Sequence, residues 1–244
     1  MNKTLQYIFS TFLGLAVFLF WVILHPYDLD FQEQNQLFLF TWDYLVERIS
    51  VCGGLADYLA EFITQFNYIP YLGEALMAVL FVVFQRACAL SIGRSEWYAL
   101  SFIAPVLMLV YMNDIYVMLC YLIALIIAVL LCALYRRHPG LLWAGIATML
   151  GYWLIGPAIF VFTVFAALKE RNWNSLILIA AAVLTVYASK WTYLQQYPWK
   201  TLAFGVNYYW HALVVPPMQL VIAAMTFIIP VLSDLLPKPK TFVN

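Results

Sequence analysis

Two aspartates stand one residue apart in the stretch "HPYDLDFQEQNQ", directly after about twenty apolar residues. In an extended segment, side chains two residues apart project to the same side. Carboxylates that converge repel each other unless a cation or a shared proton lies between them, and Mg²⁺ or Mn²⁺ takes oxygen ligands of this kind. One carboxylate can instead serve as a general base toward an acceptor hydroxyl. Asp28 and Asp30 are therefore the predicted catalytic residues and the predicted ligands of a magnesium or manganese ion.

A plainer interpretation of these two acids stands beside the catalytic one. Both can be ordinary solvated loop acids, one of which caps a helix that begins near Phe31. If the protein is an enzyme, we expect the two acids to converge with Lys190 or Lys200 beside a lipid-sized cavity. If the acids have a structural role, we expect their side chains to point apart into solvent.

Five further polar residues are candidates for substrate binding: Glu33, Asp114, Lys190, Lys200 and His211. Asp114, in the turn "MND", can add a carboxylate to the acidic pair. The two lysines are cations that a donor phosphate needs, and His211 ends the aromatic stretch "SKWTYLQQYPWKTLAFGVNYYWH". Each also has a plainer role, as a helix cap for Asp114, a snorkelling anchor for the lysines, and part of the interfacial aromatic belt for His211.

The composition indicates that membrane-spanning helices position these residues. Hydrophobic residues make up 66% of the 244 residues and charged residues 10%, with a mean hydropathy of +0.88. Soluble domains carry roughly one quarter charged residues. The sequence therefore predicts an all-α, polytopic transmembrane helix bundle with about eight helices. The apolar runs cover about 5–24, 69–92, 97–112, 115–135, 140–152, 155–168, 173–189 and 212–233.

The stretch 140–168 allows two topologies. Its roughly 29 residues either cross the membrane twice or form one long helix that is kinked at a Gly-Pro pair. Arg136 and Arg137 precede it, and Lys169 and Arg171 follow it. Because basic residues favour the cytoplasmic side, both ends belong there, and two short helices are predicted.

Charge asymmetry sets the predicted orientation. With a cytoplasmic N-terminus and eight crossings, nine basic residues lie inside and three outside, so both termini are predicted to be cytoplasmic in a bacterial inner membrane. The inner set is Lys3, Arg86, Arg94, Arg136, Arg137, Lys169, Arg171, Lys238 and Lys240; the outer set is Arg48, Lys190 and Lys200. Nine of the twelve acids fall outside, so any chemistry is expected to face outward.

Two external segments are predicted, 25–68 and 188–211. Within the first, one helical stripe is followed by a "CGG" break and a second stripe, which predicts two amphipathic helices along the membrane surface. The first stripe is Phe38, Trp42, Leu45, Val46 and Ile49, opposite Asp43 and Glu47. The second is Leu55, Tyr58, Leu59, Phe62, Ile63 and Phe66, opposite Asp57 and Glu61. The apolar stripes are predicted to be buried and the acids solvated. Neither helix has a basic face, so both are expected to pack on the bundle and frame a groove, or else to be simple connectors.

An apolar first helix, an outer loop that opens with "DLD", two surface helices and a return helix resemble the beginning of the C-type (GT-C) membrane glycosyltransferases, over about residues 5 to 92. The resemblance implies an extracytoplasmic groove, a polyprenyl-phosphate sugar as donor and a catalytic acid in the first outer loop, which carries over to Asp28, Asp30 and Glu33. Separately, "DFQEQNQLFLFTWDYL" and "GGLADYLAEFITQFNYIPYLG" are similar to the N-terminal membrane part of a bacterial family of unknown function, with a further extracytoplasmic region after its helices. This second likeness covers most of the chain.

The remaining sequence features bound the function. A net charge of zero argues against nucleic acid as a partner, and no ionisable residue must lie at the membrane centre, which argues against an ion-coupled transporter. Membrane lipid is the expected partner, with a polyprenyl-phosphate sugar if the chain is an enzyme. The alternative is a non-enzymatic scaffold or partner-binding module, or a truncated inactive family member. The 244 residues are expected to form a single membrane domain, and this can be the N-terminal part of a longer protein that has a C-terminal extracytoplasmic domain or a partner chain.

Overall fold

The computed structural model describes residues 2–25, 27–170, 173–192, 197–205, 207–210 and 214–236. The secondary structure of these residues is helical, apart from an isolated antiparallel bridge between Val117 and Tyr209. The prediction of an all-α bundle is therefore confirmed.

The long helices follow the apolar runs of the sequence. They are α1 (Lys3–Leu19, continued as a π-helix over Phe20–Leu24), α5 (Leu72–Ile92), a 3-10 helix (Ser95–Phe102) that runs into α6 (Ile103–Tyr111), α7 (Leu119–Arg137), α8 (Leu141–Ile155), α9 (Ile159–Glu170), α10 (Asn174–Thr192) and α12 (Pro217–Leu235). Six helical segments of the described chain are long and apolar enough to cross a membrane, with residues 141–170 counted as one and the shorter stretch Ser95–Tyr111 left out. The polytopic architecture agrees with the prediction.

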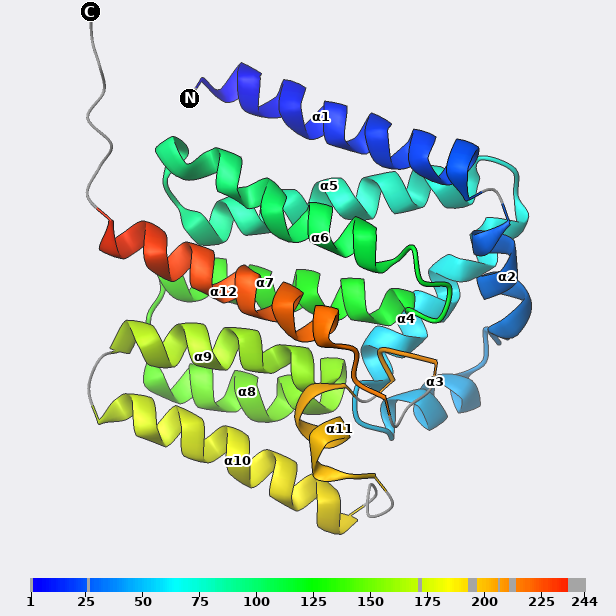
Figure 1. Ribbon diagram of the computed structural model, residues 1–244. Helices are drawn as coiled ribbons and strands as arrows, with labels where there is room; N and C mark the ends of the chain where they lie inside the picture. Colours follow the sequence, from blue (N-terminus) through cyan, green and yellow to red (C-terminus); the bar gives the residue numbers. More distant parts are fainter. Residues whose placement is uncertain are drawn as a thin grey trace, which may run out of the picture.

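Residues 141–170 fold back on themselves as two short helices. A 3-10 turn over Gly156–Ala158 separates α8 from α9, and Gly156 takes a φ of +75°, which favours glycine. The hydroxyls of Thr148 and Thr163 lie 2.9 Å apart, so the two helices run side by side. The two short helices predicted for this stretch are confirmed, and the start of α1 and the end of α12 lie at the same end of the bundle (Figure 1).

Helix α7 forms the centre of the bundle. Most of its residues are buried, and it packs against α5, α4 and α9. By contrast, α1 packs mainly on α5 at the edge of the bundle, as Figure 1 shows. Large apolar side chains on the outer faces, such as Phe12 and Leu150, are more than half exposed, as expected for surfaces that contact lipid tails.

A buried polar cluster joins α1 to α5 and to the following 3-10 helix. The Ser10 hydroxyl donates to Gln85 Oε1 at 2.7 Å, and the Gln85 amide donates to Ser101 at 2.7 Å. The Tyr98 hydroxyl lies 2.8 Å from Ser10. Gln85 is fully buried, and an unsatisfied amide in an apolar environment is costly. These contacts therefore fix the depth of α1 against α5.

Short helices cover the end of the bundle opposite the start of α1 and the end of α12 (Figure 1). They are α2 (Asp28–Asn35), α3 (Trp42–Ile49), α4 (Gly54–Thr64, continued as a 3-10 helix over Gln65–Tyr68) and α11 (Trp199–Phe204). The two amphipathic helices predicted after the first span correspond to α3 and α4. The expectation of an extended segment at "DLD" is wrong, because Asp28 and Asp30 lie in the first turn of α2.

The predicted inner faces of α3 and α4 are correct only in part, because Leu59 and Ile63 pack against the hydrophobic core while Phe62 and Trp42 are exposed. The residues of α4 that are buried are Gly54, Ala56, Ala60, Glu61 and Thr64, and Asp57 is half-buried, whereas Phe62 is 38% exposed. The small side chains on the buried face allow α4 to approach α7 closely. Lipid tails are as apolar as a protein core, so the large hydrophobic residues of a membrane protein need not face inward. Tyr58 and Phe62 of α4 instead pack on Phe38, whose ring centroid lies 5.0 Å from that of Tyr58.

Candidate functional site

A pocket opens where α3 and α4 meet the start of α7 and the segment 207–210. It has a volume of about 270 Å³ and includes acidic, basic, amide and aromatic side chains. We refer to it as the Asp57 pocket. Its lining residues are Gln36, Arg48, Asp57, Ala60, Glu61, Met118, Cys120, Asn207, Tyr209 and Trp210.

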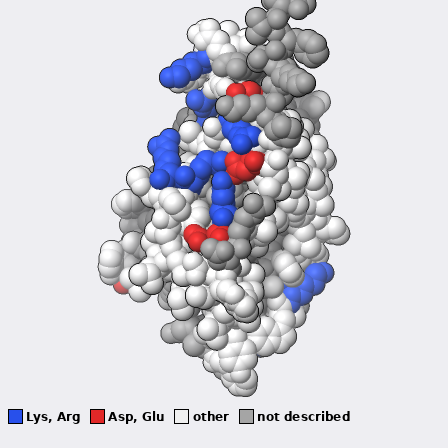
Figure 2. All heavy atoms as spheres, turned by 90° about the vertical axis from the view of Figure 1, so that its left-hand side faces the viewer, with Lys and Arg blue, Asp and Glu red and all other residues white. Residues whose placement is uncertain are grey.

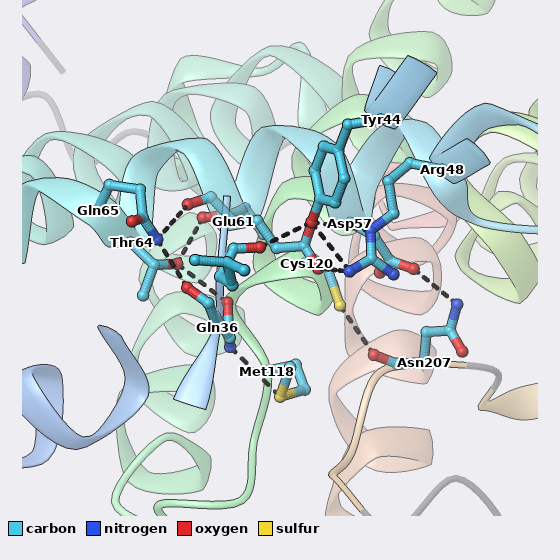
Figure 3. Close-up of polar contacts among 12 residues, drawn as sticks. Gln36, Tyr44, Arg48, Asp57, Glu61, Thr64, Gln65, Met118, Cys120 and Asn207 are labelled. Atoms are coloured by element: carbon cyan, nitrogen blue, oxygen red, sulfur yellow. Dashed lines mark hydrogen bonds and ion pairs between the residues drawn. The ribbon is translucent and has the colours of Figure 1, made fainter. Parts of the chain in front are cut away.

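Asp57 is the most strongly perturbed acid at this pocket. Its Oδ2 accepts a hydrogen bond from Asn207 Nδ2 at 2.6 Å (Figure 3). The thiol of Cys120, which donates to Asn207 O at 2.9 Å, is also within hydrogen-bonding reach of the Asp57 carboxyl. Burial raises the pKa of Asp57 from 3.8 to about 7, and the two hydrogen bonds oppose that shift. Because the folded-state pKa lies above that of the unfolded chain, Asp57 stabilises the fold most when protonated. That contribution is lost as the pH rises from about 4 through about 7.

An ion pair lies beside Asp57 and links α3 to α4. Arg48 Nη2 lies 2.7 Å from Glu61 Oε1, and the Tyr44 hydroxyl donates to Glu61 Oε2 at 2.6 Å. Arg48 also donates to the Tyr44 hydroxyl from Nε and Nη2, at 3.0 and 2.9 Å. Burial raises the pKa of Glu61, against the hydrogen bond from Tyr44 and the charge of Arg48. Figure 3 shows these side chains pointing toward one another at the pocket wall.

The far wall of the pocket is the segment 207–210, which pairs with the chain that enters α7. Met118 N donates to Tyr208 O at 3.1 Å, and Trp210 N donates to Tyr116 O at 2.8 Å. Asn207 takes a φ of +60°, a conformation that asparagine tolerates better than most residues. These bonds hold the Asn207 amide against Asp57.

Gln36 and the break after α3 fix the position of α4. The Thr64 hydroxyl, at the end of α4, donates to Gln36 Oε1 at 3.2 Å. The Gln65 amide, in the 3-10 extension of α4, donates to the backbone carbonyl oxygen of Gln36 at 2.8 Å. At the other end, Gly53 N donates to the carbonyl oxygen of Trp153 at 2.8 Å, and Gly53 has a φ of +83°. The "CGG" break therefore lets α4 start directly against α8.

The predicted acids lie apart from this pocket, with one exception. Asp28 Oδ2 lies 2.6 Å from His25 Nδ1, Asp30 is exposed, and Glu33 is half-buried; none of them is among the pocket's lining residues. Asp114 reaches the pocket indirectly, because its Oδ2 accepts a hydrogen bond from the Tyr209 hydroxyl at 2.8 Å. It supports the wall rather than facing the space.

The predicted basic residues are not brought to the acids either. Lys190 lies in the last turn of α10, donates to the carbonyl oxygen of Tyr197 and lies 5.9 Å above the Trp199 ring. Lys200 is exposed on α11. Neither is among the pocket's lining residues, and His211 lies outside the described residues. Their assignment to a substrate phosphate stays a prediction.

A magnesium or manganese site does not follow from this arrangement. Within the described ranges, no three His, Cys, Asp or Glu side chains come close enough together to hold a metal ion. Asp28 and Asp30 lie two residues apart in one helical turn, a spacing that directs side chains to different sides. The residues therefore do not fit the metal expected at "DLD", and no reaction step is assigned to one.

Sequence reasoning missed Asp57, Glu61, Arg48 and Asn207 as site residues. A signal for the first two was present in the small residues Ala56 and Ala60, which with Thr64 repeat every four positions along α4. This pattern marks a face on which one helix packs closely against another. Asn207 carried no signal, because its contact with Asp57 spans 150 positions of the chain.

The fold and the pocket define a class of protein: a multi-pass helical bundle with a half-buried acid, whose carboxyl is shielded from water, at the end opposite the start of α1 and the end of α12. The chain belongs to a family of unknown function (DUF6057), whose family model matches residues 1–244. The likeness to a bacterial family of unknown function is consistent with this membership. No curated protein and no solved structure matches the chain.

The Arg48–Glu61 pair provides a test of the pocket's geometry. Arg48→Met removes the cation that pairs with Glu61 and leaves the poorly hydrated carboxylate with the hydrogen bond from Tyr44. The substitution should therefore lower the free energy of unfolding in detergent by about 1–3 kcal/mol. The double variant Arg48→Met/Glu61→Gln should recover most of this loss in thermal unfolding. Equal melting temperatures for the single and double variants would show that the two side chains are not coupled.

Proposed function

We propose that this protein is a membrane glycosyltransferase that moves a sugar from a lipid-phosphate donor, with Asp57 as the general base. The observation that carries the proposal is a carboxyl whose pKa is raised to about 7, at the wall of a pocket of about 270 Å³. A general base works best when its pKa lies near the working pH. The resemblance to GT-C enzymes, which place a catalytic acid between their first two long helices, supports the same class.

The pocket chemistry suits a sugar ring. Tyr209 and Trp210 offer flat apolar faces, and Gln36 and Asn207 offer amide donors and acceptors. In the proposed reaction, Asp57 takes the proton of an acceptor hydroxyl while that oxygen bonds to the anomeric carbon. The bond from this carbon to the phosphate oxygen breaks, and the lipid phosphate leaves with the electron pair. Arg48 is the cation that the pocket offers to that leaving group.

A separate apolar cavity supports a lipid donor. It has a volume of about 310 Å³ and lies between α9 and α12, with Tyr121, Val164 and Phe227 in its wall. Tyr121 and Tyr208, which line it, are the chain neighbours of Cys120 and Asn207 in the Asp57 pocket. The walls of the apolar cavity and of the Asp57 pocket are therefore adjacent along the chain at two places, and we propose that the prenyl chain of the donor lies in the apolar cavity.

The proposal includes a location, which is a bacterial inner membrane with both termini in the cytoplasm and the Asp57 pocket on the outer side. Asp43, exposed on α3, and Arg137, exposed at the end of α7, lie at opposite ends of the bundle. A cysteine at position 43 should react with a membrane-impermeant maleimide in intact cells, and one at position 137 only after permeabilisation. The four native cysteines are buried and should stay unlabelled. The reverse pattern would place the pocket in the cytoplasm.

Activity is tested with synthetic polyprenyl-phosphate sugars that carry glucose, mannose or arabinose. Purified protein would be mixed with host membranes as the acceptor source, and released polyprenyl phosphate measured by mass spectrometry. Asp57→Asn should lower the release by about 10²- to 10⁴-fold, because an amide keeps the shape and cannot accept the proton. Asp43→Asn, at an exposed position on α3, is the matched control and should keep wild-type release.

Asp28→Asn and Asp30→Asn separate the two assignments of the base. If either removes activity and Asp57→Asn does not, the acid in the "DLD" stretch is the base and the pocket assignment is wrong. If the wild-type protein releases no polyprenyl phosphate from any of the three donors, the result favours the alternative, a scaffold for a partner chain or for a further extracytoplasmic domain.

A further inference from the structure

A second polar cavity lies at the opposite end of the bundle, near the start of α1 and the end of α12. Its volume is about 400 Å³, and it lies between the start of α1, the end of α5, the residues that follow α5 and the end of α7. Four arginines line it: Arg86, Arg94, Arg136 and Arg137. Figure 2 shows lysine and arginine side chains gathered on this end of the molecule. We refer to it as the arginine cavity.

The positive charge of this cavity is only partly neutralised. Arg136 lies 2.7 Å from Asp234, but the same carboxylate also lies 2.6 Å from Lys169, so one acid serves two cations. Arg94 donates to backbone carbonyl oxygens at the end of α12, including that of Leu236 at 3.1 Å. Among the described residues, neither Arg86 nor Arg137 forms an ion pair with a carboxylate. The cavity therefore carries an excess of positive charge.

The guanidinium of Arg86 has a buried donor nitrogen whose hydrogen bonds are unsatisfied within the described residues. Its guanidinium lies 4.9 Å above the ring of Tyr7, which holds the planar group in place. The Nη1 atom is buried and has no hydrogen-bond partner within the part of the chain that the structure describes. A buried guanidinium N–H without a partner is costly, and an anionic oxygen is the acceptor that satisfies it best.

Contacts of Tyr98 and Gly93 position the walls of the arginine cavity. Tyr98, which lines it, donates its hydroxyl to Gln6 O at 2.9 Å and lies 2.8 Å from the Ser10 hydroxyl. Gly93 has a φ of +70°, and a Cβ atom at that position would lie 2.9 Å from Cδ of Arg136. The glycine therefore lets the Arg136 side chain pass close to the backbone that ends α5.

The surroundings of the cavity suit a lipid. The cavity lies where the candidate membrane spans end, and the ends of such spans are expected at the depth of the phospholipid head groups. On one side of the cavity, α1 lies at the edge of the bundle. Leu90 lines the cavity and is 45% exposed, and Leu134, next to the lining residue Ala133, is 46% exposed. An acyl chain can lie along these side chains while its phosphate meets the arginines. Basic pockets between membrane helices recognise anionic head groups in this way.

We propose that the arginine cavity binds the phosphate of an anionic phospholipid, with Arg86 and Arg137 as the residues that contact it. This site is independent of the Asp57 pocket and of the glycosyltransferase proposal. The planar guanidinium matches two phosphate oxygens at once, which a point charge such as lysine does not. The phosphodiester monoanion of phosphatidylglycerol or cardiolipin is the predicted ligand.

The test compares lipid binding by wild-type protein and three variants in detergent. Thermal unfolding and native mass spectrometry would be measured with phosphatidylglycerol, with cardiolipin, with phosphatidylcholine and with inorganic phosphate alone. Arg86→Gln and Arg137→Gln should each weaken phosphatidylglycerol binding by about tenfold, because each removes a charged donor. Lys3→Gln, which removes one charge near the same end without lining the cavity, should leave binding unchanged.

Each outcome decides the proposal. Preference for the two anionic lipids over phosphatidylcholine, lost in the two arginine variants and kept in Lys3→Gln, supports it. Equal binding by all variants would show that the lipid does not use this cavity, and an equal shift with inorganic phosphate alone would assign the site to a free anion. Because Arg137 is exposed, its variant should fold normally, so a loss of binding there is not explained by misfolding.

Discussion

The close packing of α4 on α7 removes the carboxyl groups of Asp57 and Glu61 from bulk water. Other contacts at this end of the bundle pair these two groups or donate hydrogen bonds to them. Ala56 and Ala60 have little side chain, so the two helices approach closely and bring Asp57 and Glu61 inward with them. A carboxylate in such a place is unfavourable unless it is protonated, hydrogen-bonded or paired. Asp57 is hydrogen-bonded to Asn207, and Glu61 is paired with Arg48 and hydrogen-bonded to Tyr44.

Other parts of the fold serve that arrangement. The tight turn between α8 and α9 at Gly156 leaves room for the Gly53 backbone, which starts α4. The hydroxyl of Tyr208 donates to Ile155 O at the end of α8 and accepts from Ala158 N at 2.9 Å, which holds the segment 207–210 over the start of α7. The acids of the Asp57 pocket lie at one end of the bundle, and four arginines whose charge is only partly neutralised lie at the other.

Much of the architecture could be predicted from sequence because the membrane imposes a strong length and polarity rule. The apolar runs correspond to the long helices, and the basic residues around 140–168 correctly indicated two short helices. The same rule explains the main error. In water an apolar stripe must face the protein core, but on a helix that contacts lipid it need not, so Phe62 and Trp42 lie exposed while Tyr44 is buried.

The candidate site was harder to predict for a second reason. The acids of "DLD" are close in sequence and easy to notice, but local spacing does not determine burial. The helical pattern predicts a solvated Asp57, because this acid stands opposite a hydrophobic stripe. Its partners Cys120 and Asn207 come from distant parts of the chain. Only the packing of α4 against α7 reveals that this acid, rather than Asp28 or Asp30, lines the pocket.

Asp57 has a carboxyl that is shielded from water and whose pKa is raised to about 7. Infrared difference spectroscopy of the purified protein measures this directly, because a protonated carboxyl has its own stretching band. We expect a band that is present at about pH 5, disappears with a midpoint near the pKa of about 7, and is missing in Asp57→Asn. A wild-type spectrum without any Asp57-dependent carboxyl band at pH 5 would contradict the account, since Asp57 would then be an ordinary ionised acid.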